Sequence, residues 1–265
     1  AQSAGVRLGD TILAVDGNST SSMSLNESTQ SIRGATGTNV RLTLRSAGEA
    51  GSHDLAITRA PLNTPAVMAE PREGVEYVKV RRFQDGVARS VQDALVASAQ
   101  NGARGWIIDL RSTSSGSIQE VLDLASLFVG SRVVGAVVDR SQRPAAIRSQ
   151  GQALDPQLPT VVLIDADTGS GAEILAAALK EGQAATLVGA HTSGRVGLSQ
   201  VVQLPDGSAA QITSQRILTA SGGKLEGVGV EPDYAVDSVA DDWVQGRDPQ
   251  LSRAIALLPD VSAES

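Results

Sequence analysis

The pattern of apolar positions changes character near residue 75. From there on, short continuous apolar runs alternate with stretches in which apolar residues recur every three or four positions. The first pattern is typical of buried strands and the second of amphipathic helices. Alternating strands and helices predict an α/β fold, a mostly parallel sheet flanked by helices. The expected strands are 75–80, 105–111, 132–139, 160–165 and 185–190, and the expected helices are 86–102, 117–130, 171–182 and 248–258.

The first 60 residues predict a smaller β-rich unit. Strands are expected at 11–15, 38–45 and 53–59, where β-branched and alternating residues gather. A helix is expected at 24–34, because Ser24 followed by Glu27 forms a capping box. The proline-rich stretch 61–74 is expected to be a linker. The predicted organisation is therefore a unit at 1–60, a linker at 61–74 and an α/β core at 75–265.

Composition narrows the possible functions. The chain has 265 residues, 41% of them apolar but only 2% aromatic, so the core must be aliphatic. Its net charge of −7 comes without a basic cluster, which argues against a nucleic-acid partner. Cysteine is absent, which excludes disulfides and thiolate chemistry. No apolar run reaches the roughly 18–20 residues that a membrane helix needs. No cofactor and no metal is expected.

One serine lies between the strand expected at 160–165 and the helix expected at 171–182. Ser170 lies between Gly169 and Gly171. It could be a helix cap next to residues that ease a turn. It could also be a nucleophile, because a tight strand-to-helix turn lifts a serine out of the sheet and the helix amino terminus favours developing negative charge. The local sequence alone leaves both interpretations open.

Several segments, taken in order, resemble one protein family. Residues 1–45 are similar to the later part of a bacterial PDZ domain, and the core is similar to the carboxyl-terminal processing peptidases, also called tail-specific proteases. The resemblance covers nearly the whole chain. The core segments that carry it are 105–130, 160–182, 187–200, 204–233 and 248–258.

The resemblance implies a serine endopeptidase with a Ser–Lys dyad. The nucleophile position matches Ser170 in "TGSGAEI", and the general-base position matches Arg195 in "TSGR", 195 − 170 = 25 residues later as in the family. A buried lysine can lose its proton and activate serine, whereas arginine stays charged. Catalysis is therefore expected to be impaired. His191 in the same loop is an alternative base, although an exposed loop histidine is the simpler interpretation.

Two further departures concern the surroundings of the dyad. Ser115 and Gly116 stand where the family has a Gly-Gly pair whose amides help to form the oxyanion hole. Gly116 remains an oxyanion candidate, while a serine at the first position could fail to adopt the same backbone angles. The glutamine that orients the lysine maps to Gln200 after a one-residue insertion. Lys180 lies about 15 Å along the helix from Ser170, and Lys224 lies in a glycine-rich turn, so neither is expected to replace the base.

The resemblance leads to two function hypotheses. One is an impaired serine endopeptidase that acts on protein or peptide carboxyl-terminal tails. The other is a catalytically inactive homologue that binds peptides or serves as a scaffold in a homo-oligomer or larger complex. An extracytoplasmic location, periplasmic or at a bacterial cell surface, is expected from the family. The chain begins inside the PDZ pattern. We therefore expect either an upstream strand or a strand from another chain. Any membrane association is expected only through an upstream segment.

Overall fold

The computed structural model describes residues 1–7, 9–61, 64–139 and 143–259, with only the backbone of residues 2, 198–200, 211, 213–214 and 240. The chain forms two compact units. One contains residues 1–64 together with 238–248, and the other contains 65–237 together with the residues from 249 onward. The short segment 238–248 thus belongs with the amino-terminal unit, although it follows the core in sequence. Local patterning could not show this long-range association.

The amino-terminal unit contains a four-stranded antiparallel sheet in the order β2-β1-β3-β4. The expected helix begins as predicted: the Ser24 Oγ accepts the Glu27 N–H, and the Glu27 carboxylate accepts the Ser24 N–H. Strands β1 and β3 supply the small core of Val15, Val40, Leu42 and Leu44. The elements are η1 (Gln2–Ala4), β1 (Thr11–Val15), β2 (Asn18–Ser19), α1 (Leu25–Ile32), β3 (Asn39–Arg45), β4 (His53–Thr58) and α5 (Ala240–Val244).

The core unit is built on a six-stranded sheet in the order β14-β11-β10-β7-β6-β5. All neighbouring pairs are parallel except β5 with β6, which confirms the predicted mostly parallel sheet. The strands are β5 (Val67–Arg72), β6 (Val75–Val80), β7 (Trp106–Asp109), β10 (Thr160–Ile164), β11 (Thr186–Gly189) and β14 (Tyr234–Ala235).

Strand β5 corrects one prediction, because it lies within the expected linker 61–74. It pairs antiparallel with β6, from Val67 opposite Val80 to Arg72 opposite Val75. Pro71 argued against a strand, since proline cannot donate a ladder hydrogen bond. The sheet order places β5 at an edge, where one side of the strand needs no partner. The proline is therefore compatible with this strand.

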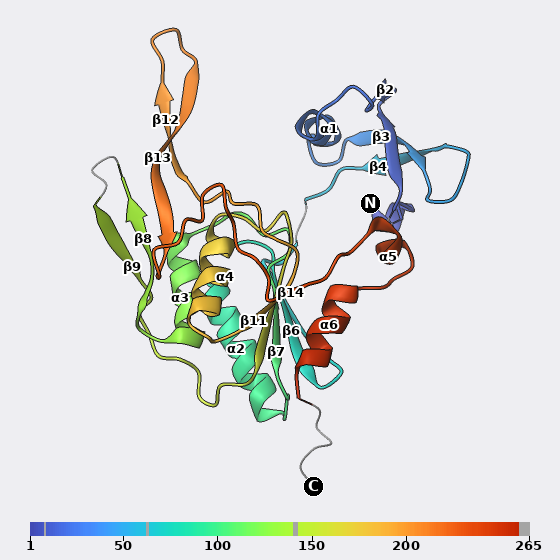
Figure 1. Ribbon diagram of the computed structural model, residues 1–265. Helices are drawn as coiled ribbons and strands as arrows, with labels where there is room; N and C mark the ends of the chain where they lie inside the picture. The colour runs from blue at the N-terminus through green and yellow to red at the C-terminus, as the bar shows by residue number, and fades with distance from the viewer. Residues whose placement is uncertain (8, 62–63, 140–142, 260–265) are drawn as a thin grey trace. The chain divides into compact units, whose positions relative to one another are not determined.

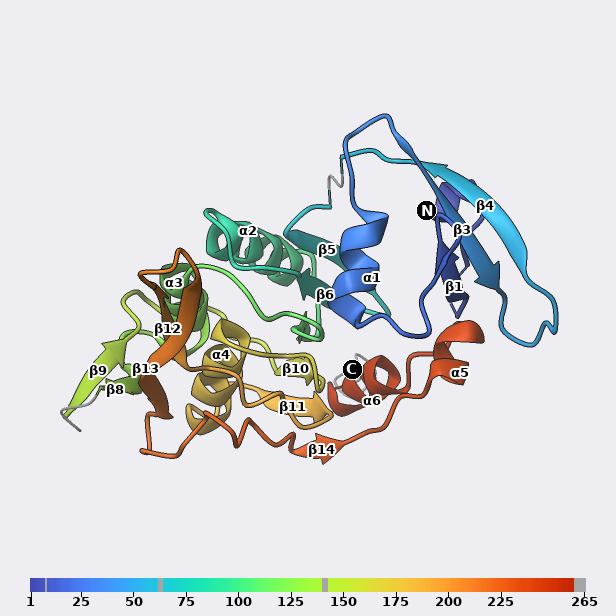
Figure 2. The same cartoon turned by 90° about the horizontal axis from the view of Figure 1, so that it is seen from above.

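Helices cover both faces of the central sheet, as Figures 1 and 2 show. Helices α2 (Val87–Gln100), α3 (Ile118–Val129) and α4 (Gly171–Glu181) pack on one face, and α6 (Pro249–Leu257) packs on the other. Each lies within the range predicted for it.

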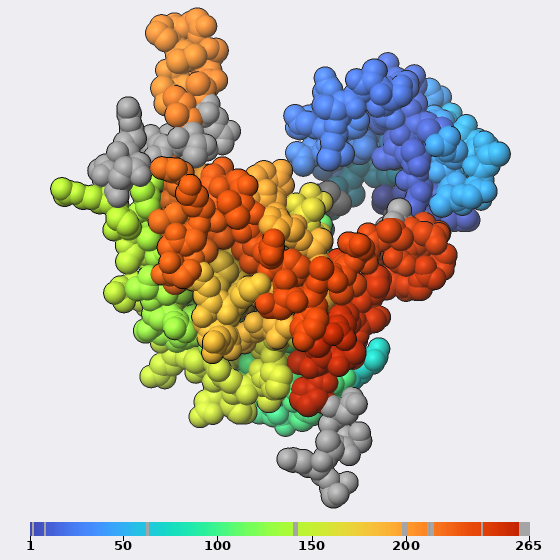
Figure 3. All heavy atoms as spheres, viewed as in Figure 1, coloured from blue at the N-terminus to red at the C-terminus, as the bar shows by residue number. Residues whose placement is uncertain are grey.

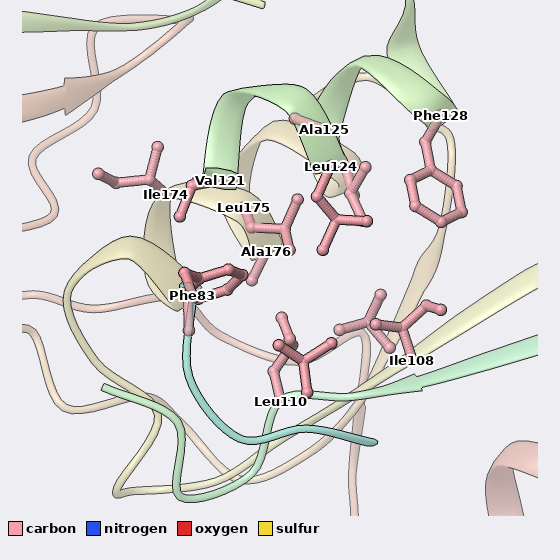
Figure 4. Close-up of a cluster of buried hydrophobic side chains, with 14 of the residues drawn as sticks. Phe83, Ile108, Leu110, Val121, Leu124, Ala125, Phe128, Ile174, Leu175 and Ala176 are labelled. Carbon is pink, nitrogen blue, oxygen red and sulfur yellow. The ribbon is translucent and has the colours of Figure 1, made fainter. Parts of the chain in front are cut away.

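Alternate residues of β10 serve the two faces of this sheet. Val162 and Ile164 join the core beneath α2, α3 and α4, part of which Figure 4 shows, whereas Val161 and Leu163 join the cluster that contains Leu251 of α6. Every residue of β10 is buried, as its apolar run predicts.

A second four-stranded sheet, in the order β12-β13-β8-β9, adjoins the helices. Its strands are β8 (Val133–Val138), β9 (Pro144–Arg148), β12 (Leu198–Gln203) and β13 (Ala209–Thr219). The β12–β13 hairpin projects from the core unit (Figures 1 and 3). Strand β9 was not predicted, because proline and alanine are poor strand formers; it forms as an edge strand beside β8.

No helix in the described parts of the chain is long and apolar enough to cross a membrane.

The packing between α3 and α4 gives a test of the core. Leu175 of α4 is fully buried, so Leu175→Ala should lower the free energy of unfolding by about 2–5 kcal/mol, through lost burial and a residual cavity. Val201→Ala is the matched control, because Val201 in β12 is 67% exposed and should change stability by less than about 0.5 kcal/mol. Urea unfolding followed by circular dichroism measures both variants. Equal effects would contradict this packing.

Candidate active site

Ser170 lies at the turn between β10 and α4, directly before the first helical residue. Its backbone angles are φ 52° and ψ −126°, an unusual conformation for a residue with a side chain. Its side chain makes no capping hydrogen bond. The structure therefore argues against the capping interpretation of this serine. Residues held in such conformations cluster at functional sites, because the surrounding structure must stabilise them.

Glu173, in the first turn of α4, holds the loop that follows β11. Its carboxylate is fully buried and accepts four hydrogen bonds from that loop. Oε1 accepts from the Thr192 Oγ1 and the Gly194 N–H, at 2.5 and 2.7 Å. Oε2 accepts from the Ser193 Oγ and the Arg195 N–H, at 3.2 and 3.0 Å. These four bonds use the acceptor capacity of both oxygens, so the loop is fixed to the helix that begins beside Ser170.

The backbone of Arg195 is in turn bonded to Ser170. The Ser170 N–H donates to the Arg195 carbonyl oxygen at 2.9 Å. On its other side, the loop is held by Glu226, whose Oε2 accepts the Val196 N–H at 2.9 Å. The structure thus brings the backbones of the two predicted dyad positions into direct contact. Sequence reasoning missed the role of Glu173; a single acidic residue within the apolar run "GAEILAAAL" was the available signal.

A cavity of about 570 Å³ lies beside Ser170. Its apolar wall comes from the helices, the second sheet and the 190–197 loop. The residues of that wall are Leu122, Val137, Ile147, Ile174, Val196 and Ile217. None of them was singled out from the sequence, because the wall exists only once α3, α4 and the second sheet come together.

Several backbone N–H groups of the cavity lining have no acceptor among the described residues, and two of them come from glycines. They belong to Gly116 and to Gly171, the residue after Ser170. Gly116 has φ 133°, and a Cβ there would lie 2.1 Å from the Phe83 carbonyl oxygen, so only glycine fits. Ser115 is not among the residues with positive φ, so the backbone does not require glycine there. The concern that a serine at 115 distorts the loop is therefore not supported.

None of the three lysines of the chain lines this cavity. Lys79 donates to Asp109 Oδ1 at 3.0 Å. Lys180 forms an ion pair with Asp233 at 3.0 Å, and Lys224 is exposed. Burial lowers the pKa of Lys79, as a dyad lysine requires, while the charge of Asp109 opposes that shift. Its ion-pair partner nonetheless holds Lys79 on the sheet face that α6 covers, away from α4.

Arg195 and His191 also lie outside the cavity lining. The Arg195 side chain is exposed, and the described residues offer it no ion pair. His191 is exposed, with its Nδ1 2.9 Å from the Thr192 carbonyl oxygen. Gln200 belongs to β12, but its side chain is outside the described residues, so its role stays a prediction. Within the described structure, no lysine or histidine is positioned to take a proton from Ser170.

A buried ionic cluster lies at the end of β7, the strand that precedes the loop containing Gly116. Asp109, at the end of β7, accepts hydrogen bonds from Tyr77, Lys79 and the Arg111 guanidinium. Burial by itself would raise the pKa of Asp109, but the hydrogen bonds and charge of Arg111 hold it below its ordinary value. Arg111 also donates to the Gln250 Oε1 of α6 at 3.1 Å.

No group of His, Asp or Glu within the described residues is suited to hold a metal ion.

The Glu173 contacts generate a stability prediction. In Glu173→Gln, an NH₂ group replaces one acceptor oxygen, so buried donors of the loop lose their partner. The free energy of unfolding should fall by about 1–3 kcal/mol, and amide exchange in residues 192–196 should accelerate. Glu226→Gln is the control, since a single described N–H donates to that carboxylate and the amide oxygen can replace it. Urea unfolding and hydrogen exchange measure both. A loss as large in the control would contradict the specific role of Glu173.

Comparisons with known proteins agree with the resemblance drawn from the sequence. Residues 74–236 match Peptidase family S41, and residues 1–46 match the PDZ domain family. A carboxyl-terminal-processing protease of Synechocystis sp. is 32% identical over 242 residues, covering 89% of this chain and 56% of that protein. The carboxy-terminal processing protease CtpA of Bacillus subtilis is 31% identical, covering 88% of this chain and 50% of that protein. The chain thus spans about half the length of these relatives.

The fold comparison leads to the same family. A solved photosystem II D1 C-terminal processing protease superposes with a TM-score of 0.69 at 25% identity, covering 99% of this chain and 70% of that one. The likeness includes the mixed α/β core, and the family match contains both Ser170 and the Glu173-bound loop. By sequence family, fold and order of segments, this chain belongs to the C-terminal processing serine proteases of peptidase family S41, with a PDZ domain at its amino terminus.

Proposed function

We propose that this chain is a serine endopeptidase of the C-terminal processing type, acting on protein carboxyl-terminal tails, with hydrolysis impaired by Arg195. The main support is the contact between the Ser170 N–H and the Arg195 carbonyl oxygen, which joins the nucleophile and base positions of the family. The named activity of the relatives, carboxyl-terminal processing, supports the substrate class. We propose an extracytoplasmic location from the family resemblance.

The proposed chemistry uses groups that the site contains. The Ser170 Oγ would attack a peptide carbonyl carbon, and the unpaired N–H groups of Gly116 and Gly171 would receive the oxygen on which negative charge develops. The attack also needs a group that takes the Ser170 proton. Arginine does not do this near neutral pH, because its pKa exceeds about 12. The slowed step would be proton transfer from Ser170, whereas the cavity that binds the substrate would remain.

The second candidate is a catalytically inactive homologue that binds peptides or acts as a scaffold in a larger assembly. The observation that favours it is the cavity lining, which includes no lysine and no histidine. Both candidates require peptide binding, and they differ in whether Ser170 hydrolyses the bound peptide. Homo-oligomerisation or a larger complex would be compatible with either candidate.

We predict weak cleavage by the protein as it stands. Loss of a general base typically reduces the rate by about 10²–10⁴-fold, so hydrolysis of casein or a tailed reporter should be slow or undetectable. A fluorogenic tail peptide measures the rate, with Ser170→Ala as the blank. Fast cleavage that disappears in Ser170→Ala would contradict the prediction and show that another base acts, with His191 to be tested next by His191→Ala.

A second prediction concerns rescue. Arg195→Lys should restore measurable cleavage that depends on Ser170, because the main chain of residue 195 already contacts Ser170. Arg195 itself is exposed and outside the cavity lining, so the shorter lysine would have to turn toward the cavity, where the aliphatic wall would partly desolvate its amine and lower its pKa. Ser115→Gly alone should leave the rate unchanged, since Ser115 does not use a positive φ. The same peptide assay compares Arg195→Lys, Ser115→Gly and the double variant. A folded double variant that stays at the blank would favour the inactive homologue.

A further inference from the structure

Gln250, in the first turn of α6, is a buried polar side chain that the proposed chemistry does not use. It is 3% exposed, and both ends of its amide are bonded. The Oε1 accepts a hydrogen bond from the Arg111 Nη1 at 3.1 Å, and the Nε2 donates to the Val236 carbonyl oxygen at 2.9 Å. The reverse orientation would place the NH₂ group against the guanidinium and the oxygen against a carbonyl, so these partners fix the amide.

The Arg111 end of this bridge leads to the loop that contains Gly116. Arg111 follows β7, and its guanidinium donates both to Asp109 and to Gln250. Its carbonyl oxygen accepts a hydrogen bond from the Lys79 Nζ. Residue 111 is therefore held through its side chain and its main chain, and the loop toward Gly116 starts from a fixed point.

The Val236 end leads to the loop that contains Arg195. The Val236 N–H donates to the carbonyl oxygen of Gly189, the last residue of β11, at 2.9 Å. A Cβ at Gly189 would lie 2.0 Å from the Ile164 carbonyl oxygen and 3.4 Å from the Gln250 Nε2. The amide of Gln250 thus lies where β10, β11 and β14 end, directly before the Ser170 turn and the 190–197 loop.

Strand β14 has little else to fix its end. It contains two residues, and its ladder places Tyr234 opposite Val188 and Ala235 opposite Gly189. Residues 238–248, which follow, belong to the amino-terminal unit, and the chain returns to the core unit at Pro249. The bond between Gln250 and Val236 therefore joins the segment before this excursion to the segment after it.

We propose that Gln250 is a positioning residue of the Ser170 site. Its oxygen holds the segment that leads to Gly116, and its nitrogen holds the segment that leads to Arg195. It does not line the cavity and acts through Arg111 and Val236. This inference rests on the proposed function, because it names how α6 holds two loops of that same site from the opposite face of the sheet.

The two ends of the amide can be separated by substitution. Gln250→Met keeps a side chain of similar length and loses both hydrogen bonds. In Gln250→Glu, the adjacent Arg111 guanidinium favours the ionised carboxylate, which accepts from Arg111 but cannot donate to Val236. A residue that only stabilises the fold would not distinguish the two loops, whereas the proposed bridge does.

The experiment measures amide hydrogen exchange at pH 7 in residues 111–117 and 190–197 of the full chain. Both segments contain bonded N–H groups, such as those of Thr113 and Ser193, so local opening is visible there. Helix α2 is the internal reference for global opening. Gln157→Met is the control variant, because the Gln157 Nε2 also donates to a carbonyl oxygen, that of Phe128, outside this cluster.

We expect Gln250→Met to accelerate exchange at least about tenfold in both loops, since buried groups lose their partners, with α2 unchanged. Gln250→Glu should accelerate residues 190–197 alone, and Gln157→Met neither loop. Equal acceleration in α2, unchanged loops in Gln250→Met, or any other pattern in Gln250→Glu would overturn the inference. If Gln250→Met does not fold, the contrast between the loops in Gln250→Glu decides. No readout requires hydrolysis, so slow peptide cleavage bears on the proposed function alone.

Discussion

The buried carboxylate of Glu173 is the contact on which the site geometry depends. It lies one turn after Ser170 on α4 and accepts four hydrogen bonds from residues 192–195. Removing a carboxylate from water is unfavourable unless its oxygens are bonded, and the loop supplies four donors to it. That arrangement places the Arg195 carbonyl oxygen against the Ser170 N–H. A helix and a distant loop thereby become one rigid unit.

The unusual backbone of Ser170 depends on this unit. A conformation with φ 52° is unfavourable for serine, and it is stabilised from both sides: the Gly169 N–H donates to the Thr113 carbonyl oxygen, and the Ser170 N–H donates to Arg195. The conformation keeps the side chain out of the capping role that a serine before a helix usually takes. Ser170 is thus held open toward the cavity by bonds of its backbone.

Sequence periodicity predicted most of the core elements because their apolar runs reflect real burial. β10 is buried along its whole length and α4 packs its apolar residues inside. The failures have physical causes. β5 contains Pro71, which suits only an edge strand, and β9 depends on pairing with β8. Such contacts are not encoded in local periodicity.

The site was predicted less completely than the fold. The spacing of Ser170 and Arg195 anticipated their contact, but as a relation of side chains, whereas the structure joins their backbones. The cavity wall combines residues from helices, a second sheet and a loop, so a linear motif could not indicate it. Glu173 was visible as an acid in an apolar run, yet its four partners lie 19 to 22 residues away.

The backbone of the site and the side chain at 195 contribute different things to the proposed reaction. The position of Ser170, the free N–H groups and the cavity all follow from backbone geometry that the fold maintains. In the function proposed above, proton transfer would in contrast depend on a single side chain at 195. On that proposal, a lysine-to-arginine difference would act on the chemical step and leave the largely aliphatic cavity in place.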